Sequence, residues 1–212
     1  MFDQLSMFDT SPPTPPAPPV RTLPAPSADG KPGVPHALFF AGVASTAGAA
    51  SLHERAGLID QQLGIGGRQL DAERLHVSLF AVGAYLDVRP DMDIARWCRA
   101  GAAVRCLPAE IVFDRVASFG GEGNPLVFKS ADDVGVAGLL ALHQALGIEL
   151  ANTGERVKRQ RITPHMTMSY RGKRIAETAI EPVRWQLHEL VLVDSHVGAH
   201  RHDVIGRWPL LA

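Results

Sequence analysis

Two short motifs, each with a histidine two residues before a hydroxyl residue, are the places where this chain could move protons. The first pairs His76 with Ser78, and the second pairs His165 with Thr167. Apolar residues follow each of them, as in a strand with one buried face, so the two polar side chains of each motif should share the other face. Imidazoles exchange protons near neutral pH, and hydroxyls hydrogen-bond phosphate oxygens. The pattern predicts acid–base chemistry on a phosphate-bearing substrate.

Basic residues surround the second motif. Seven of the 21 lysines and arginines flank it, with no acidic residue among them: Arg156, Lys158, Arg159, Arg161, Arg171, Lys173 and Arg174. The net charge of the chain is −1, so any attraction to an anion must be local. We expect the part of this segment that precedes the motif to bind an RNA chain, although a solvated loop is the commoner reason for such a run.

The repetition of the motif indicates a duplicated unit. One lobe would supply His76 and the other His165, and the two histidines would meet across a cleft. One imidazole could then act as a base while the other acts as an acid, which is the division of labour that in-line displacement at a phosphodiester requires. The two hydroxyls would hold the nonbridging oxygens. The alternative is that both motifs lie on unrelated surface strands.

A metal site is a competing interpretation of the C-terminal histidines. His196, His200 and His202 lie close together in sequence, next to Asp194, and imidazoles bind zinc. No cysteine pair or His-Glu-x-x-His pattern accompanies them, so a solvated turn is the preferred interpretation. Glycine motifs of the Walker or dinucleotide type are also missing. We therefore expect neither a metal nor another cofactor.

The composition divides the chain into a tail and one globular region. Ten of the sixteen prolines fall between Pro12 and Pro35, a composition that favours extended conformations and cannot bury a core. Residues 1–34 should be a disordered tail, and residues 35–212 the folded domain. The chain has no signal-peptide core, no membrane-length apolar run and only two cysteines, so we expect a cytoplasmic monomer.

Hydrophobic periodicity predicts an α+β fold with antiparallel sheets. Strands are expected at 37–43, 75–82, 110–119, 126–128, 165–170, 186–194 and 202–208, and helices at 46–63, 89–105 and 133–150. The repeated hairpins argue against a doubly wound parallel sheet. With the doubled motif, this order predicts two related lobes whose sheets face each other across a central cleft, with helices on the outside.

The paired motifs resemble the His-x-Thr/Ser signatures of the two-histidine phosphoesterases, and most closely those of the bacterial 2′-5′ RNA ligase (RNA 2′,3′-cyclic phosphodiesterase) group. The resemblance runs from about residue 36 to the C-terminus and includes segments 113–116, 125–127, 181–185 and 206–210. It implies metal-independent hydrolysis of 2′,3′-cyclic phosphates and, in some members, reversible ATP-independent 2′-5′ joining of RNA ends. It also implies that His76 donates a proton and that His165 activates water.

One position departs from this resemblance. The best-studied branch carries an arginine three residues after the second motif's threonine, where this chain has Tyr170, followed by Arg171. Regular alternation would put Arg171 on the face of His165 and Thr167 and turn Tyr170 away. A local twist would instead bring Tyr170 to that face. Both residues are candidates for contacting phosphate.

The tail begins with a second recognisable peptide. Gln4, Leu5, Met7 and Phe8 resemble the peptide by which bacterial proteins dock on the replicative sliding clamp, and the proline-rich segment would hold them away from the domain. A non-catalytic nucleotide- or RNA-end-binding module, recruited through this tail, is the alternative function.

Overall fold

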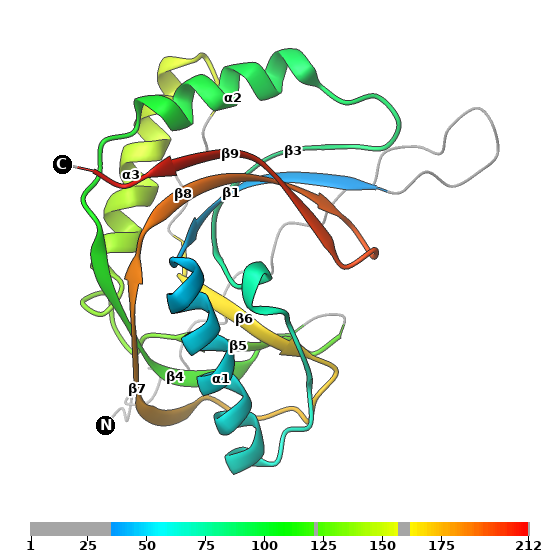
Figure 1. Ribbon diagram of the computed structural model, residues 1–212, viewed down its shortest axis with the longest axis vertical. Coiled ribbons are helices and arrows are strands. Elements are labelled where there is room, and N and C mark those ends of the chain that lie inside the picture. The colour runs from blue at the N-terminus through cyan, green and yellow to red at the C-terminus, as the bar shows by residue number, and fades with distance from the viewer. Residues whose placement is uncertain (1–34, 121–122, 157–161, 212) are drawn as a thin grey trace, which may run out of the picture.

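The computed structural model describes residues 35–120, 123–156 and 162–211 (Figure 1). Three groups of predictions fall outside these ranges: the proline-rich tail, the clamp peptide, and most of the basic segment before the second motif. The residues concerned are 1–34, with Gln4, Leu5, Met7 and Phe8 among them, and Lys158, Arg159 and Arg161. Within the described ranges, no helix has both the length and the apolar character needed to cross a membrane.

The described part of the chain alternates helices with antiparallel strands, which confirms the predicted α+β class. In chain order the elements are β1 (His36–Val43), α1 (Thr46–Leu63), β2 (Arg68–Gln69), the 3₁₀ turn η1 (Ala72–Arg74), β3 (Val77–Tyr85), α2 (Asp91–Ala103), β4 (Ala109–Ser118), β5 (Leu126–Lys129), α3 (Ala137–Asn152), β6 (His165–Tyr170), β7 (Thr178–Leu187), β8 (Glu189–His196) and β9 (Arg201–Pro209).

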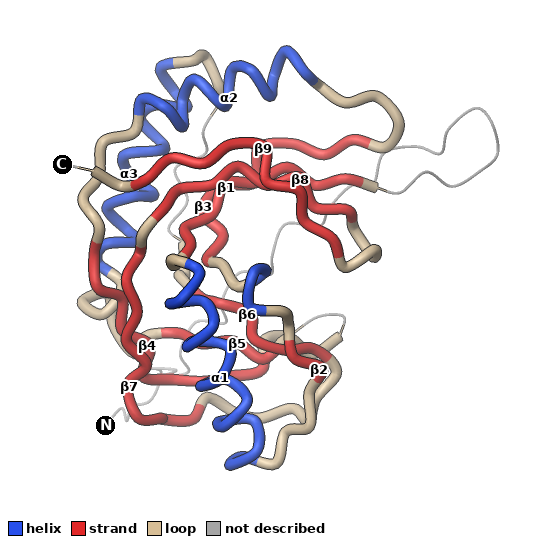
Figure 2. Tube along the Cα trace, viewed as in Figure 1, coloured by secondary structure: helices blue, strands red, loops and turns tan. Residues whose placement is uncertain are grey.

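The sheet divides at one weak junction between the two motif strands. Its order is β7-β4-β5-β6-β3-β1-β8-β9, with β2 added to β6. Strands β3 and β6 share a single registered pair, Val77 with Met166, whereas β1 and β3 share seven. Figures 1 and 2 show the resulting halves, with β1, β3, β8 and β9 above and β4 to β7 below. The two motif strands are thus innermost, one in each half, in agreement with the predicted two lobes.

Helix α1 packs one apolar stripe against the core of the lower half. Leu52, Ala56 and Ile59 are buried at the spacing of a helix face. The Ser45 side chain accepts a hydrogen bond from the backbone N–H of Gly48 and so caps the helix. Gly64, at φ 60°, ends it in the left-handed conformation that glycine adopts without a Cβ clash. Both ends agree with the sequence prediction.

The predicted strand 186–194 is wrong at its start, because it joins parts of two strands. β7 ends at Leu187 and pairs with β4 in the lower half, whereas β8 begins at Glu189 and pairs with β1 in the upper half. The backbone N–H of His188, between them, donates to the Val43 carbonyl at 2.9 Å. The chain therefore crosses from one half to the other at His188, with no turn between the two strands.

Candidate active site

The junction between β3 and β6 presents four polar side chains on one face. Val77 and Met166 form the registered pair and are both fully buried in the main core. Neighbours along a strand point to the opposite face, so the residues on either side of this pair all face away from that core. They are His76, Ser78, His165 and Thr167, four of the six residues predicted as site residues.

Antiparallel register makes the arrangement reciprocal. Extending the Val77–Met166 pair by one residue in each direction sets His76 beside Thr167 and Ser78 beside His165. Directly opposed residues of an antiparallel pair have Cβ atoms about 5 Å apart. Each imidazole therefore has the hydroxyl of the other motif as its neighbour. This pairing across the two strands cannot be deduced from either motif alone.

Both histidines are held in the same way by the backbone. The Nδ1 atom of His76 lies 2.7 Å from the Arg74 carbonyl oxygen, and that of His165 lies 2.8 Å from the Thr163 carbonyl oxygen. A carbonyl oxygen only accepts, so Nδ1 carries the proton in both rings. This leaves each Nε2 atom free to take up or release a proton.

The surroundings keep both imidazoles uncharged at neutral pH. Burial lowers the pKa of His76 below its usual value, the hydrogen bond to the Arg74 carbonyl partly offsets this, and the charges of His165 and Arg74 lower it again. Burial also lowers the pKa of His165, against the hydrogen bond from its ring to the Thr163 carbonyl. The effect of His165 on His76 shows that the two rings are close enough to interact.

An aromatic ring lies against each histidine. Phe39 stacks on His76 with ring centroids 5.1 Å apart, and Phe119 lies 4.7 Å from His165 at a tilt. Phe39 belongs to a small apolar cluster of β1 and β8 on the face opposite the main core. These contacts restrict the orientation of the two imidazoles.

A third histidine joins the site, and the solvated-turn interpretation of it is wrong. His202 lies in β9, half-buried, with its ring 5.4 Å from that of His76 and 5.9 Å from Phe39. Burial, followed by the charge on His76, lowers the pKa of His202 to about 4. His202 is therefore neutral at pH 7 and offers both a donor and an acceptor beside His76. Its sequence position gave no signal of this contact.

Lys129 is a further neighbour that the motifs did not indicate. It lies directly opposite His165 in the pairing of β5 with β6. Its ammonium group forms an ion pair with Glu177, so its charge is largely balanced. The Lys129–Glu177 ion pair therefore borders the His165 side of the site.

A β-bulge in β6 bears on the two alternatives that the sequence left open for Tyr170 and Arg171. The register against β5 shifts between Leu126 and Val127, and Met168 and Ser169 are both buried. Two successive residues on one face reverse the alternation that follows. Tyr170 therefore returns to the face of His165 and Thr167. Arg171, predicted to share that face by regular alternation, lies beyond the strand at φ 62°.

Comparison with known families agrees with the resemblance predicted from the doubled motif. A model of the 2′-5′ RNA ligase superfamily matches residues 59–199, a range that is more than half of the chain and includes both motifs. The chain belongs to this superfamily of two-histidine phosphoesterases. No curated sequence shows significant similarity to the chain.

Solved structures agree with the superfamily assignment at the level of the fold. The structure of E. coli LigT complexed with 3′-AMP has a TM-score of 0.61 and 20% identity, with 84% of this chain and 99% of LigT covered. TT0787 of Thermus thermophilus has a TM-score of 0.59 and 18% identity, with 82% and 97% covered. The structure of E. coli LigT complexed with ATP has a TM-score of 0.57 and 19% identity, with 84% of this chain and 99% of LigT covered.

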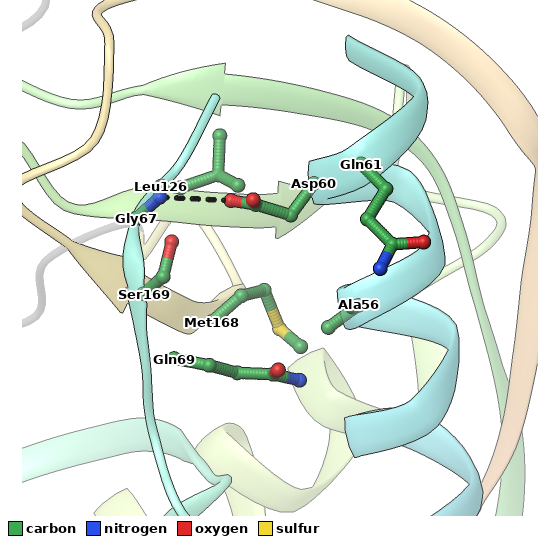
Figure 3. A pocket seen from close by; sticks show the side chains of 9 residues that line it. Ala56, Asp60, Gln61, Gly67, Gln69, Leu126, Met168 and Ser169 are labelled. Atoms are coloured by element: carbon green, nitrogen blue, oxygen red, sulfur yellow. Dashed lines mark hydrogen bonds between the residues drawn. The ribbon is translucent and has the colours of Figure 1, made fainter. Parts of the chain in front are cut away.

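A cavity of about 160 Å³ lies on the other side of β6, between this strand and α1. Asp60, Gly67, Met168 and Ser169 line it (Figure 3). The Asp60 carboxylate accepts hydrogen bonds from the backbone N–H groups of Gly66 and Gly67 at 3.0 and 3.1 Å. The superfamily motifs point to the opposite face, so this cavity is not the candidate active site.

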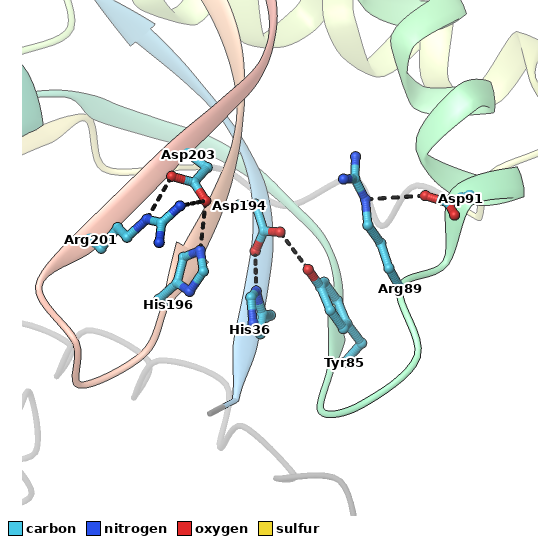
Figure 4. A network of polar contacts seen from close by, with 8 residues as sticks. All are labelled: His36, Tyr85, Arg89, Asp91, Asp194, His196, Arg201 and Asp203. Carbon is cyan, nitrogen blue, oxygen red and sulfur yellow. Dashed lines mark hydrogen bonds and ion pairs between the residues drawn. The ribbon is translucent and has the colours of Figure 1, made fainter. Parts of the chain in front are cut away.

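A polar network lies at the far end of the upper half (Figure 4). His36, Asp194 and His196 have ligand atoms within 4.8 Å of one another and are the described residues that could hold a metal ion. Hydrogen bonds already engage these residues: His36 donates to Asp194 at 2.7 Å, Tyr85 donates to Asp194, and His196 donates to Asp203 at 2.8 Å. Burial and Asp194 raise the pKa of Tyr85 to about 12.

This network corrects the earlier interpretation of the C-terminal histidines. His196 is half-buried in β8, His202 faces the active site, and among the three only His200 is an exposed turn residue. Among the described residues, His196 clusters with His36 and Asp194 and not with His200 and His202, the grouping weighed as a competing interpretation. We interpret the cluster around Asp194 as a structural network in this superfamily member.

We expect Asp194→Ala to lower the free energy of unfolding by about 2–3 kcal/mol, because it leaves the buried donors of His36 and Tyr85 without an acceptor. Urea denaturation measures this. Asp91→Ala is the matched control, since Asp91 is 78% exposed and forms only a surface pair with Arg89, worth about 0–1 kcal/mol. Equal losses in the two variants would contradict the structural role of Asp194.

Proposed function

We propose that this protein hydrolyses RNA 2′,3′-cyclic phosphate ends through a histidine pair, without a metal ion. The supporting observation is the reciprocal geometry of His76 and His165: one face, equivalent hydrogen bonds to the backbone, and two free Nε2 atoms. Two imidazoles supply the acid and the base that opening a cyclic phosphodiester requires. RNA ends and cyclic nucleotides are the corresponding ligands.

In the proposed reaction, His165 Nε2 removes a proton from water as the water oxygen attacks phosphorus. His76, protonated at Nε2, gives its proton to the departing ribose oxygen as the P–O bond of the ring breaks. His165 takes up one proton and His76 releases one, so the products are a phosphomonoester and a free hydroxyl. A neutral His76 must first gain a proton, and the negative phosphate favours this by raising the pKa of the imidazole.

Ser78 and Thr167 are proposed to position the phosphate. Their hydroxyls alternate with the imidazoles around the junction, so each could hydrogen-bond a nonbridging oxygen while phosphorus lies between the two Nε2 atoms. Tyr170 shares this face because of the bulge and offers a further donor. Arg171 lies beyond the strand and would act at the edge of the site.

The same geometry supports a ligation reaction, in which an RNA hydroxyl replaces water as the nucleophile. If the 5′-hydroxyl of a second RNA attacks the cyclic phosphate in place of water and the 3′ oxygen departs, the product is a 2′-5′ linkage. Because the ring supplies the leaving group, no ATP is consumed. Ligation and hydrolysis would then share both histidines.

The pKa shifts predict an acidic optimum. The pH dependence of kcat/KM reports the pKa values of the free protein. One imidazole must be charged and the other neutral, so kcat/KM should be highest at a pH between the two pKa values. Both pKa values are lowered from 6.5, so the bell-shaped profile for a 2′,3′-cyclic nucleotide should peak below pH 6.5. Circular dichroism over the same range controls for acid unfolding. An optimum above pH 7 would contradict this electrostatic description.

A panel of 2′,3′-cyclic nucleotides and RNAs with cyclic-phosphate ends, assayed with and without EDTA, tests the proposal. Turnover that persists in EDTA is the expected result. Tight binding of these ligands without turnover would favour the alternative function, a non-catalytic RNA-end-binding module recruited through its tail. Activity that disappears with EDTA would overturn the metal-independent mechanism.

A further inference from the structure

Three arginines from separate segments meet around a cavity of about 80 Å³. Arg68 comes from β2, Arg74 from η1, and Arg171 from the end of β6. The remaining lining residues that matter here are Tyr170 and His200. Asp71 is the single acidic residue among those lining this cavity, so the three guanidinium groups give it a net positive charge.

These arginines have no carboxylate partner among the described residues. Arg96, Arg184 and Arg207, by contrast, hold carboxylates at 2.7–3.0 Å. The Nε atom of Arg74 is buried and has no hydrogen-bond acceptor within the described part of the chain. A buried donor without a partner is costly, and an anion entering the cavity would supply the missing acceptor.

The cavity adjoins the candidate active site. The carbonyl of Arg74 accepts the hydrogen bond that fixes His76, and the charge of Arg74 lowers the pKa values of His76 and His202. Tyr170 lines the cavity and shares the face of His165. A nucleic acid held by the catalytic pair would therefore extend past these arginines.

Arg171 reaches the cavity through an unusual backbone conformation. Its φ of 62° is in the left-handed region, which is unfavourable for a residue other than glycine. Its backbone N–H donates to the Gly123 carbonyl at 2.6 Å and holds this turn in place. The conformation takes Arg171 out of the strand and toward Arg68, which pairs with Tyr170 through β2.

We infer that this cavity binds the phosphate group on the 5′ oxygen of the terminal nucleoside, which in RNA is the phosphodiester that joins it to the rest of the chain. The inference rests on the proposed function for the placement of the cyclic end. Three converging guanidinium groups match the oxygens of a phosphate, and the small volume suits a phosphate better than a nucleobase. The preferred substrate is then an oligonucleotide.

Equilibrium binding of nucleotides with a terminal 3′-phosphate tests this site separately from catalysis. Calorimetry would compare 3′-AMP, adenosine 3′,5′-bisphosphate and the dinucleotide ApAp with the full-length protein. We expect both ligands with a phosphate on the 5′ oxygen to bind more tightly than 3′-AMP. Arg68→Gln should weaken binding of the two ligands with a phosphate on the 5′ oxygen about 10-fold and weaken binding of 3′-AMP less than about 2-fold. For the first two ligands, the slope of log K against log salt concentration should fall by about one.

Two further variants make the result specific. Arg68→Lys keeps the charge and should retain most of the affinity. Arg99→Gln removes a positive charge from the exposed face of α2 and should change nothing. Equal tightening by the bisphosphate and by ApAp supports the inference and identifies the phosphate itself as the recognised group.

Other outcomes would overturn it. If Arg68→Gln weakened all three ligands equally, the arginines would belong to the terminal-phosphate site or to the fold. If ApAp gained affinity and the bisphosphate did not, the second nucleoside and not the phosphate would be recognised. The expected binding pattern in a protein that failed to hydrolyse cyclic phosphates would support the cavity and refute only the proposed function.

Discussion

Replacing either His76 or His165 with alanine should remove nearly all hydrolysis of a 2′,3′-cyclic phosphate while the protein stays folded. A missing general acid or base typically costs about 10²–10⁴-fold, or roughly 3–5 kcal/mol of barrier. Both rings are half-buried at the edge of the core, so their removal leaves the main core intact. Initial rates on a cyclic mononucleotide and on an RNA with a cyclic end measure the effect.

A matched histidine provides the control. His188 is exposed between β7 and β8, so His188→Ala should retain full activity. The two active-site variants should still bind 3′-AMP, because Ser78 and Thr167 remain. Substantial turnover in either variant would rule out the histidine pair, and loss of the cooperative unfolding transition would assign those residues a structural role instead.

Met166→Ala should cause the largest loss of stability among single changes at the junction, about 2–5 kcal/mol. Its side chain is fully buried and forms the only registered pair between β6 and β3 in the described residues. The cavity left behind removes contacts from both halves of the sheet. Urea denaturation measures the loss, and the same variant should lower turnover because the pair sets the spacing of the histidines.

Met92→Ala is the corresponding control, since Met92 is 86% exposed on α2. Surface substitutions of this kind stay within about 0.5 kcal/mol of the parent protein. A loss below about 1 kcal/mol in Met166→Ala would mean that the two halves are held together elsewhere.

Local patterns were enough to predict the elements whose stability is local. Helix α1 has its cap at Ser45, its apolar stripe and its stop at Gly64 within one segment, and its bounds agree with the prediction. Most of strand β7 was missed because Pro182 lies within it, and its last two residues were joined to β8 because no turn separates the two strands. Periodicity cannot show where a chain passes from one half of a sheet to the other.

The site was predictable only where a motif contained its residues. His76 and His165 could be paired because the same pattern occurs twice, each time beside a hydroxyl. His202 and Lys129 reach the site through the pairing of distant strands, so nothing near them in the sequence marks them. The face of Tyr170 depended on a bulge that regular alternation cannot predict.

The hydrogen bonds from the two imidazoles to backbone carbonyls also bear on how this site tolerates change. Many catalytic histidines depend on an aspartate or glutamate that accepts the hydrogen bond from the ring, and without that carboxylate the correct tautomer is no longer favoured. Here the acceptors are the carbonyls of Arg74 and Thr163, which every amino acid supplies. Side chains at positions 74 and 163 can therefore be exchanged without removing the acceptor that fixes the tautomer of either ring, although loss of the Arg74 charge would raise the pKa of His76. Designers could alter the entrance to the site at these positions while the proton-transfer geometry stays fixed by the main chain.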